Sequence, residues 1–211
     1  MIIDSTFFHG KILIPNLGIG VGKINIEPLI ENECYSFLQS LLGYEIYSDL
    51  EQHLDSDLNL KPDAPQKYLD LFYGKKYDDK HWKGLIDVKK LGKYSLLADY
   101  VWLKWYEDNI TLTSTNGQVV LDAKNTMRVN PTDKYVEVWN GLVRKVHGYL
   151  GYKKPYVTYK ECIKFTDYYG LRNNQNVNLE EFLHDFKEDY PNPTLLLPDG
   201  NILRVKNTLG L

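Results

Sequence analysis

Apolar residues recur at steps of three and four in three long segments of this chain, and this spacing constrains the fold more than any other feature of the sequence. The segments span residues 26–43, 91–109 and 130–150. Each would carry an apolar stripe along one side of a helix, and residues 91–109 would form the longest helix, at the centre of the core. Stripes of this kind must pack against one another, so we expect a mainly α-helical body.

Shorter segments repeat the same spacing. Residues 45–54 and 65–74 each fit a short helix. Asn178 and Glu181 have the spacing of a capping box, which predicts the start of a further helix. Residues 75–84 are charged and lack a regular pattern, so we expect a loop there. The fold class that follows is a helical bundle with about five to seven helices.

One β-hairpin is expected inside the helical body. Asn116-Gly117 lies between two runs rich in β-forming residues, Ile110 to Thr115 and Gln118 to Leu121. Asn-Gly readily supplies the positive φ angles that a two-residue hairpin turn needs. The sequence therefore predicts a hairpin insertion near residues 110–121, with Asn116 and Gly117 at the tip of a projecting element.

The two ends of the chain differ from its middle. Residues 1–25 combine a short apolar run with three glycines in residues 18–22, which predicts an extended N-terminal arm. Residues 26–150 would form the helical body. Residues 151–211 would form a C-terminal helical subdomain that ends in a small hairpin or an extended arm.

The apolar residues of the C-terminal arm are candidates for contact with a partner: Leu195, Leu196, Leu197, Ile202, Leu203 and Val205.

The charge balance argues against sequence-independent binding to nucleic acid. Lys and Arg number 25 against 28 Asp and Glu, which gives a net charge of −3. Such a chain has no bulk positive field to attract phosphate backbones.

Only two cysteines occur, in separate helical patterns, which fits a reducing compartment. No signal peptide and no apolar stretch of about 18 residues is present, so we expect no secretion and no membrane span.

No motif of catalysis or of metal binding is complete. The five histidines lie on separate segments, without the spacing of a metal site. Asp55, Asp57 and Asn59 resemble the start of a calcium loop, but Leu60 replaces its turn glycine and Gln66 replaces its last glutamate. We therefore expect no catalytic residue, no metal, no cofactor and no enzymatic activity.

A basic and aromatic segment offers a second candidate contact surface. Tyr152, Tyr156 and Tyr159 alternate with lysines between Tyr152 and Lys160. Such residues could anchor a protein partner, or they could contact phosphates and stack on bases. Since few basic residues are present, the sequence favours the protein partner and keeps nucleic acid as the alternative.

The segment from Leu91 to Leu150 resembles the head–tail connector, or adaptor, proteins of tailed bacteriophages that infect Bacteroidetes (crAss-like phages). The resemblance rests on a Tyr- and Trp-rich helix, the hairpin centred on Asn116-Gly117, and the run from Met127 to Pro131 that leads into a helix containing Trp139-Asn140. A helix ending in residues 37–44 extends it to residues 27–150.

This resemblance implies a non-enzymatic virion protein of the neck or tail, assembled in the host cytoplasm. Its partners would be a homo-oligomeric ring of about twelve subunits, the portal protein and an adjacent neck or tail ring protein. The ring would surround the DNA exit channel, and genomic DNA would pass it without specific binding. The alternatives are another neck or tail-completion protein, or a phage-encoded regulator that binds nucleic acid through residues Tyr152 to Lys160.

Overall fold

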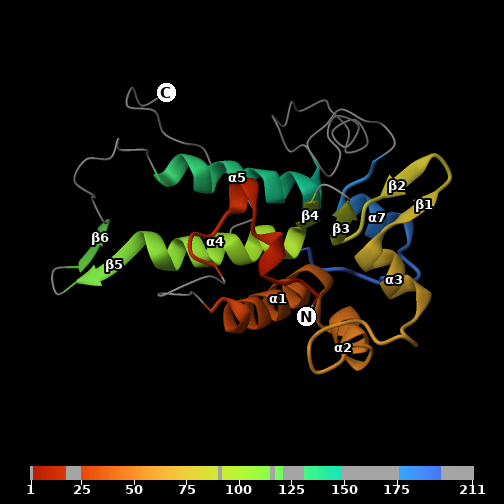
Figure 1. Cartoon of the computed structure of the whole chain (residues 1–211). Coiled ribbons are helices and arrows are strands. Elements are labelled where there is room, and N and C mark those ends of the chain that lie inside the picture. Colours follow the sequence, from red (N-terminus) through yellow and green to blue (C-terminus); the bar gives the residue numbers. More distant parts are fainter. Residues whose placement is uncertain are drawn as a thin grey trace.

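The computed structural model describes residues 2–17, 25–89, 92–114, 117–120, 131–148 and 176–195. These residues form α-helices, two short 3-10 turns and three two-stranded antiparallel ribbons. Figure 1 shows the helices side by side, with the ribbons at the two ends of the body. The mainly α-helical fold with a β-hairpin insertion is therefore confirmed.

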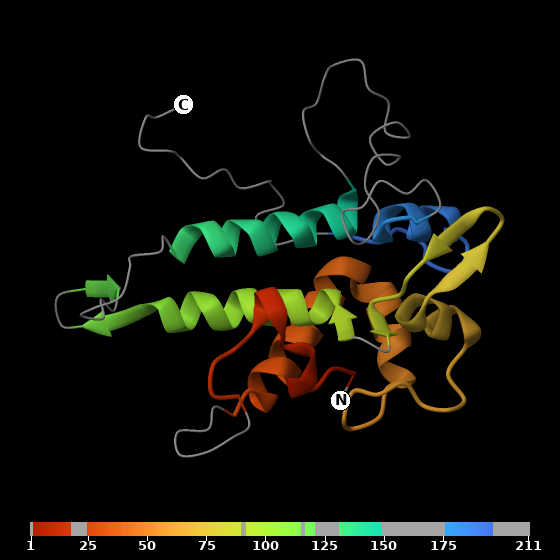
Figure 2. The same cartoon turned by 45° about the horizontal axis from the view of Figure 1, so that its top comes forward.

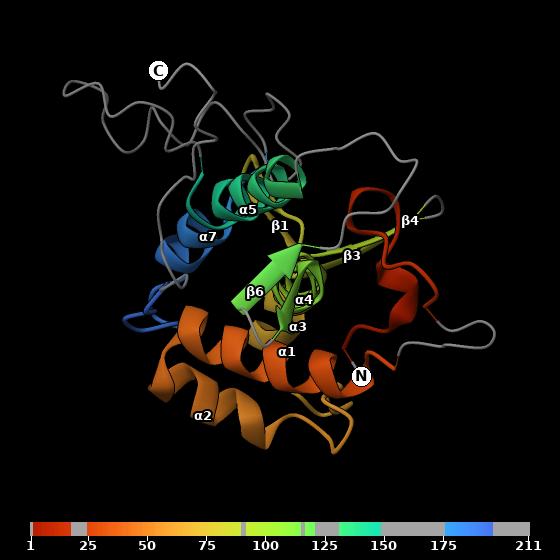
Figure 3. The same ribbon diagram turned by 90° about the vertical axis from the view of Figure 1, so that its left-hand side faces the viewer.

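Three long helices form the centre of the molecule: α1 (Glu27–Leu42), α4 (Leu96–Ile110) and α5 (Pro131–His147). Helix α4 lies between α1 and α5 and contacts both, as the view along its axis in Figure 3 shows. Leu97, Val101 and Trp102 of α4 have no exposed surface. A helix that is apolar on most sides is stable only when it is enclosed, and α4 is enclosed by its two neighbours.

Stacked aromatic rings join the three central helices. Phe37 of α1 stacks on Tyr100 of α4 with ring centroids 4.3 Å apart. On the other side of α4, Tyr106 stacks on Tyr135 of α5 at 6.2 Å, and Tyr135 lies parallel to Trp139 at an interplanar angle of 8°. Each ring buries a large apolar area, and such pairs add about 0.5–1.5 kcal/mol beyond that burial.

Helix α4 begins later than the sequence predicts. Residues Ile86–Lys89 and Gly92–Ser95 form the ribbon β3–β4, so the predicted helix over residues 91–109 starts only at Leu96. The side chain of Ser95 accepts a hydrogen bond from the Leu97 amide at 3.1 Å, which caps the helix. With 15 residues α4 is also shorter than α5, which has 17.

A second ribbon occupies the segment expected to be irregular. Strands β1 (Lys75–Tyr77) and β2 (Lys80–Trp82) pair antiparallel, and α7 (Leu179–Asp185) packs beside them in Figure 2. Lys80 bonds the carboxylates of Glu181 at 3.0 Å and Asp185 at 2.6 Å. The ribbon therefore depends on a partner more than 100 residues away in the sequence, which local spacing cannot indicate. The cap at Asn178 is as expected, since its side chain accepts from the Glu181 amide at 2.9 Å.

Helices α2 (Tyr44–Gln52) and α3 (Gln66–Tyr73) match the two short predicted helices. Asp49 of α2 joins them, because its Oδ2 accepts from Lys67 Nζ at 2.7 Å and from Tyr68 Oη at 2.6 Å. Both hydrogen bonds lower the pKa of the Asp49 carboxyl, and the one from Lys67 has the larger effect.

Residues 2–17 are packed into the body, where the sequence predicts an extended arm. They form the 3-10 turns η1 (Ser5–Phe7) and η2 (Gly10–Ile12), which lie against β4, α4 and α5. Ile3, Phe7, Phe8 and Ile14 all belong to the hydrophobic core. The short, irregular apolar run lacks helical spacing, but its large side chains gain more by burial than they would as a free arm.

We expect Phe8→Ala to lower the free energy of unfolding by about 3–5 kcal/mol, because it removes a buried ring. Urea denaturation followed by circular dichroism measures the change. The matched control is Leu13→Ala, at a position that is 54% exposed, with an expected change within about 0.5 kcal/mol. Equal, small effects of the two substitutions would show that the segment does not stabilise the body.

We expect Asp49→Asn to destabilise the protein by about 0.5–1 kcal/mol at pH 7, because the charge-assisted hydrogen bonds are weakened at a half-exposed site. A lowered folded pKa stabilises the fold fully above the ordinary value of 3.8, and this contribution is lost as the pH falls through the folded pKa. Urea denaturation at pH 7 and near pH 3 should therefore show that the difference in free energy of unfolding between the native chain and Asp49→Asn becomes smaller in acid. Asp63→Asn, at an exposed position, is the control.

Candidate interaction sites

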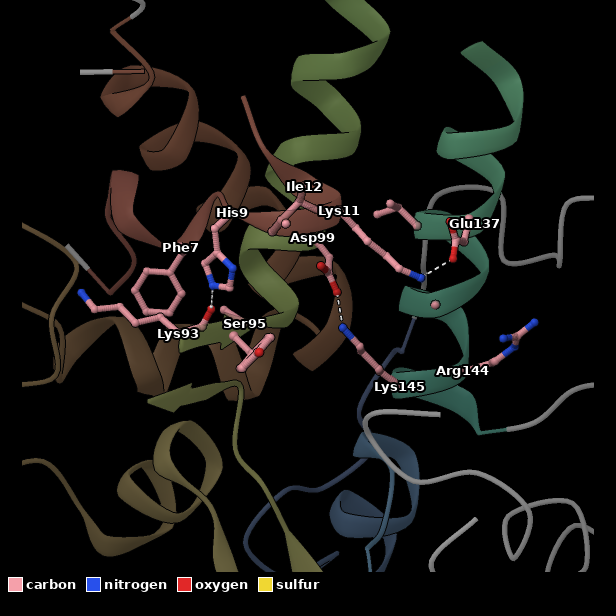
Figure 4. A pocket seen from close by; sticks show the side chains of 14 residues that line it. Phe7, His9, Lys11, Ile12, Lys93, Ser95, Asp99, Glu137, Arg144 and Lys145 are labelled. Carbon is pink, nitrogen blue, oxygen red and sulfur yellow. Dashed lines mark hydrogen bonds and ion pairs between the residues drawn. The ribbon is translucent and has the colours of Figure 1, made fainter. Parts of the chain in front are cut away.

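A cavity of about 450 Å³ lies between the N-terminal segment, β4, α4 and α5. Figure 4 shows that its side chains come from all four elements. Phe7, Ile12 and Val138 provide apolar wall, and Tyr94 adds a half-exposed ring. The volume lies within the range of pockets that bind small molecules.

Ion pairs cross this cavity and fix the charges on its walls. Lys145 of α5 bonds Asp99 of α4 at 2.5 Å, and both side chains are less than one fifth exposed. Lys11 of η2 pairs with Glu137 of α5. These pairs tie the N-terminal segment and α4 to the same side of α5 (Figure 4). Each lysine of the lining is matched by a carboxylate, since Lys93 pairs with Asp4 at 3.1 Å, and Arg144 adds a further cationic side chain to the wall.

His9 and Ser95 line the cavity but do not form a nucleophile and its base. Nε2 of His9 lies 2.7 Å from the backbone oxygen of Lys93, so Nε2 carries the proton. The hydroxyl of Ser95 donates to the Leu85 carbonyl at 2.9 Å and caps α4. Both groups are therefore engaged in joining segments of the fold.

The thiol of Cys34 is similarly unsuited to catalysis. It lies in the core on α1 and is 1% exposed. Burial raises the pKa of this thiol to about 12, so it stays protonated near neutral pH.

Asp55, the first residue of the calcium-like stretch, accepts hydrogen bonds from the amides of Asp57 and Asn59. Its carboxylate thus stabilises a local turn, and we find no group of metal-binding side chains within the described ranges.

Gly141 is an unusual residue in the wall of the cavity. It lies in the interior of α5, where glycine is unfavourable by about 1 kcal/mol relative to alanine. A Cβ atom added at this position would meet no other atom within 4 Å. Close packing therefore does not require glycine at position 141, and the sequence keeps the wall open at a cost to helix stability.

The predicted hairpin is the second candidate site. Strands β5 (Thr111–Ser114) and β6 (Gly117–Val120) pair antiparallel, with Ser114 opposite Gly117. Strand β5 follows α4 without an intervening loop. Figures 1 and 2 show the ribbon beyond the end of the helical body, on the side opposite to β1–β2 and α7. Gly117 thus begins β6 and pairs with Ser114, so the prediction that Gly117 lies in the two-residue turn is wrong. Asn116 lies outside the described residues.

The start of the predicted C-terminal arm is docked on the body. The Leu195 amide donates to the carbonyl of Leu41 in α1 at 2.8 Å, and the Leu195 side chain packs against the core. Leu195 is therefore engaged within the chain. Other predicted contact residues lie outside the described residues: Leu196, Leu197, Ile202, Leu203, Val205, Tyr152, Tyr156 and Tyr159.

Sequence reasoning found the hairpin but did not identify the cavity. The cavity joins residues 7–12, 93–99 and 137–145, which no local spacing relates to one another. One signal was present in the sequence: Gly141 interrupts an otherwise regular helical pattern between Trp139 and Leu142.

Comparison with known proteins gives no match to a family model, to a curated protein or to a solved structure. Within the described ranges, none of the helices combines the length and the apolar character needed to cross a bilayer.

We expect Gly141→Ala to raise the free energy of unfolding by about 0.5–1 kcal/mol, because alanine favours the helix and the added methyl group meets no neighbour. Thermal and urea denaturation measure the change.

Gly74→Ala is the matched control. Gly74 has φ +94°, and a Cβ atom there would lie 2.6 Å from the backbone oxygen of Trp82, so this substitution should destabilise the protein. A loss of stability in Gly141→Ala would contradict the open wall that the structure shows at α5.

Proposed function

We propose that this chain is a non-enzymatic virion protein, a subunit of a ring that joins the portal to the tail of a bacteriophage around the DNA exit channel. The observation that carries the proposal is the continuation of α4 into a hairpin that projects from one end of a helical body. A buried helix fixes the direction in which such a hairpin projects, so the hairpin can reach a neighbouring molecule.

The two ends of the body suit the contacts of a ring. The hairpin lies at one end, and β1–β2 with α7 lies at the other (Figure 1). A cyclic ring is built from heterologous contacts, in which one face of each subunit meets a different face of the next. The resemblance of residues 27–150 to connector proteins supports the same assignment.

The charge of the chain is compatible with a channel for DNA. A net charge of −3 provides little attraction for phosphate groups, so DNA can pass without being held. The partners under this proposal are further copies of the chain, the portal and the next ring of the neck. Assembly would take place in the host cytoplasm, and the protein would become part of the virion.

The competing proposal is a regulator that binds nucleic acid through residues Tyr152 to Lys160. It predicts retention on DNA that falls steeply as salt rises. The connector proposal predicts no such retention at physiological salt.

The native mass of the purified chain, measured by light scattering with and without the cognate portal, tests the connector proposal. We expect a ring, alone or on the portal, and negative-stain images of the same samples should show it. A chain that stays monomeric and ignores the portal would overturn the proposal, and salt-dependent retention on DNA would then favour the regulator.

We further expect a chain that stops after Leu195 to fold normally and to lose incorporation into particles, because residues 196–211 would supply the arm that meets the portal or the next ring. Keeping Leu195 preserves its hydrogen bond to Leu41, so circular dichroism should be unchanged. Undiminished incorporation of this truncated chain would remove the arm from the account.

A further inference from the structure

The hairpin β5–β6 differs from the rest of the chain in composition. Residues 110–121 contain no Lys, Arg, Asp or Glu and no Pro, although 25% of the whole chain is charged. Proteins protect the free edges of their sheets with charges, proline, bulges or a covering segment. The sequence of this ribbon carries neither of the first two devices, so its edges are suited to pairing with another strand.

Among the described parts of the chain, the hairpin has no third strand beside it. Strand β5 pairs with β6, and neither strand pairs with a third among the residues that the structure describes. Within the same residues, α4 is the main element that the ribbon contacts. A two-stranded hairpin is at best marginally stable in water, and at least three strands or a covering element are needed. A ribbon that projects from the body is therefore stabilised by a further strand or by an element that covers it.

The register defines which backbone groups are available at the edges. A two-residue connection makes Ser114 and Gly117 the closing pair, which shares the ladder hydrogen bonds. The pairs then alternate, so Leu112 with Val119 is the next bonded pair. Thr113 and Gln118 form a non-hydrogen-bonded pair within the hairpin. Their amide and carbonyl groups therefore face the outer edges of the ribbon.

We propose that the outer edge of β6 pairs antiparallel with the outer edge of β5 in a second copy of this chain, so that the hairpins of a ring form one continuous sheet. Gln118 would then lie opposite Thr113 of the next copy, which repeats the register within each hairpin. This inference rests on the proposed ring and names the strands that join its subunits.

Three features favour a second copy as the occupant. The hairpin itself pairs these two strands antiparallel through their inner edges, and the same alignment of residues brings the outward backbone groups of Gln118 and Thr113 together between copies. Since neither strand is charged, identical copies meet without repulsion. Pairing of β6 with the next β5 uses two different edges, so it can close by rotation and leave no free edge. A pairing of two β6 edges would stop at two copies.

The sheet that results has a regular pattern on its two faces. Leu112 and Val119 are register partners, so they recur as an apolar row from copy to copy. Thr111, Thr113, Gln118 and Val120 occupy the alternate positions and therefore the other face. Neither strand contributes a charged residue to this sheet.

The pairing is tested with copies that carry one introduced cysteine beside the buried Cys34. We would replace Cys162 by serine, then prepare Thr113→Cys and Gln118→Cys as separate proteins and mix them under mild oxidation. Because each copy carries one new thiol, a disulfide between positions 113 and 118 can form only between copies. We expect covalent dimers in the mixture and not in either protein alone, and their absence from assembled rings would overturn the proposal.

A proline substitution tests the same edge by assembly. Gln118→Pro removes an amide that faces outward and leaves the bonded pair of Leu112 and Val119 in place. We expect the concentration needed for half-maximal assembly to rise at least about tenfold. Gln118→Thr keeps the amide and is the matched control, which should assemble like the native chain.

The outcomes separate this inference from the proposed function. Rings of the native chain and of Gln118→Pro that form equally well, without crosslinks in the mixture, would overturn the pairing and leave the connector function standing. If copies crosslink to one another but their assemblies do not bind the portal, the pairing would be supported and the proposed connector function would be overturned. Crosslinks from position 113 or 118 to the portal instead would overturn the choice of a second copy.

Discussion

The burial of α4 between α1 and α5 is the interaction on which the rest of the structure depends. Its fully buried side chains and the stacked rings on both of its sides join the three long helices into one core. The cap at Ser95 sets where α4 begins, and η1 and η2 cover that end. At the other end α4 runs directly into β5, so the packing of the core also determines where the hairpin projects.

The sequence predicted the elements whose stability comes from their own spacing. The apolar repeats indicated α1, α4 and α5, and Asn116-Gly117 indicated the hairpin. The ribbons β1–β2 and β3–β4 were missed because their strands are three or four residues long and are held by contacts distant in the sequence, such as Lys80 with α7. The N-terminal segment was misjudged for a related reason. Its burial depends on a surface that exists only once α4 and α5 have packed together.

The cavity and the hairpin differ in how far the sequence could indicate them. The cavity arises where four segments meet, and its lysines and carboxylates are matched only in space, as Lys145 and Asp99 are. The glycine at position 141, in the interior of α5, was the one feature of the local sequence that indicated the cavity. The hairpin is encoded locally, and its lack of charge suits contact with another molecule more than exposure to water. We therefore attribute stability to the matched charges around the cavity and propose that the hairpin serves assembly.

Cryo-electron microscopy of portal-containing particles assembled with this chain tests the central claim, the proposed ring, most directly. The account predicts a ring immediately below the portal into which the α1, α4 and α5 body fits, with the β5–β6 hairpins of adjacent copies joined around the DNA channel. A well-resolved neck in which no ring accommodates this fold would contradict the account.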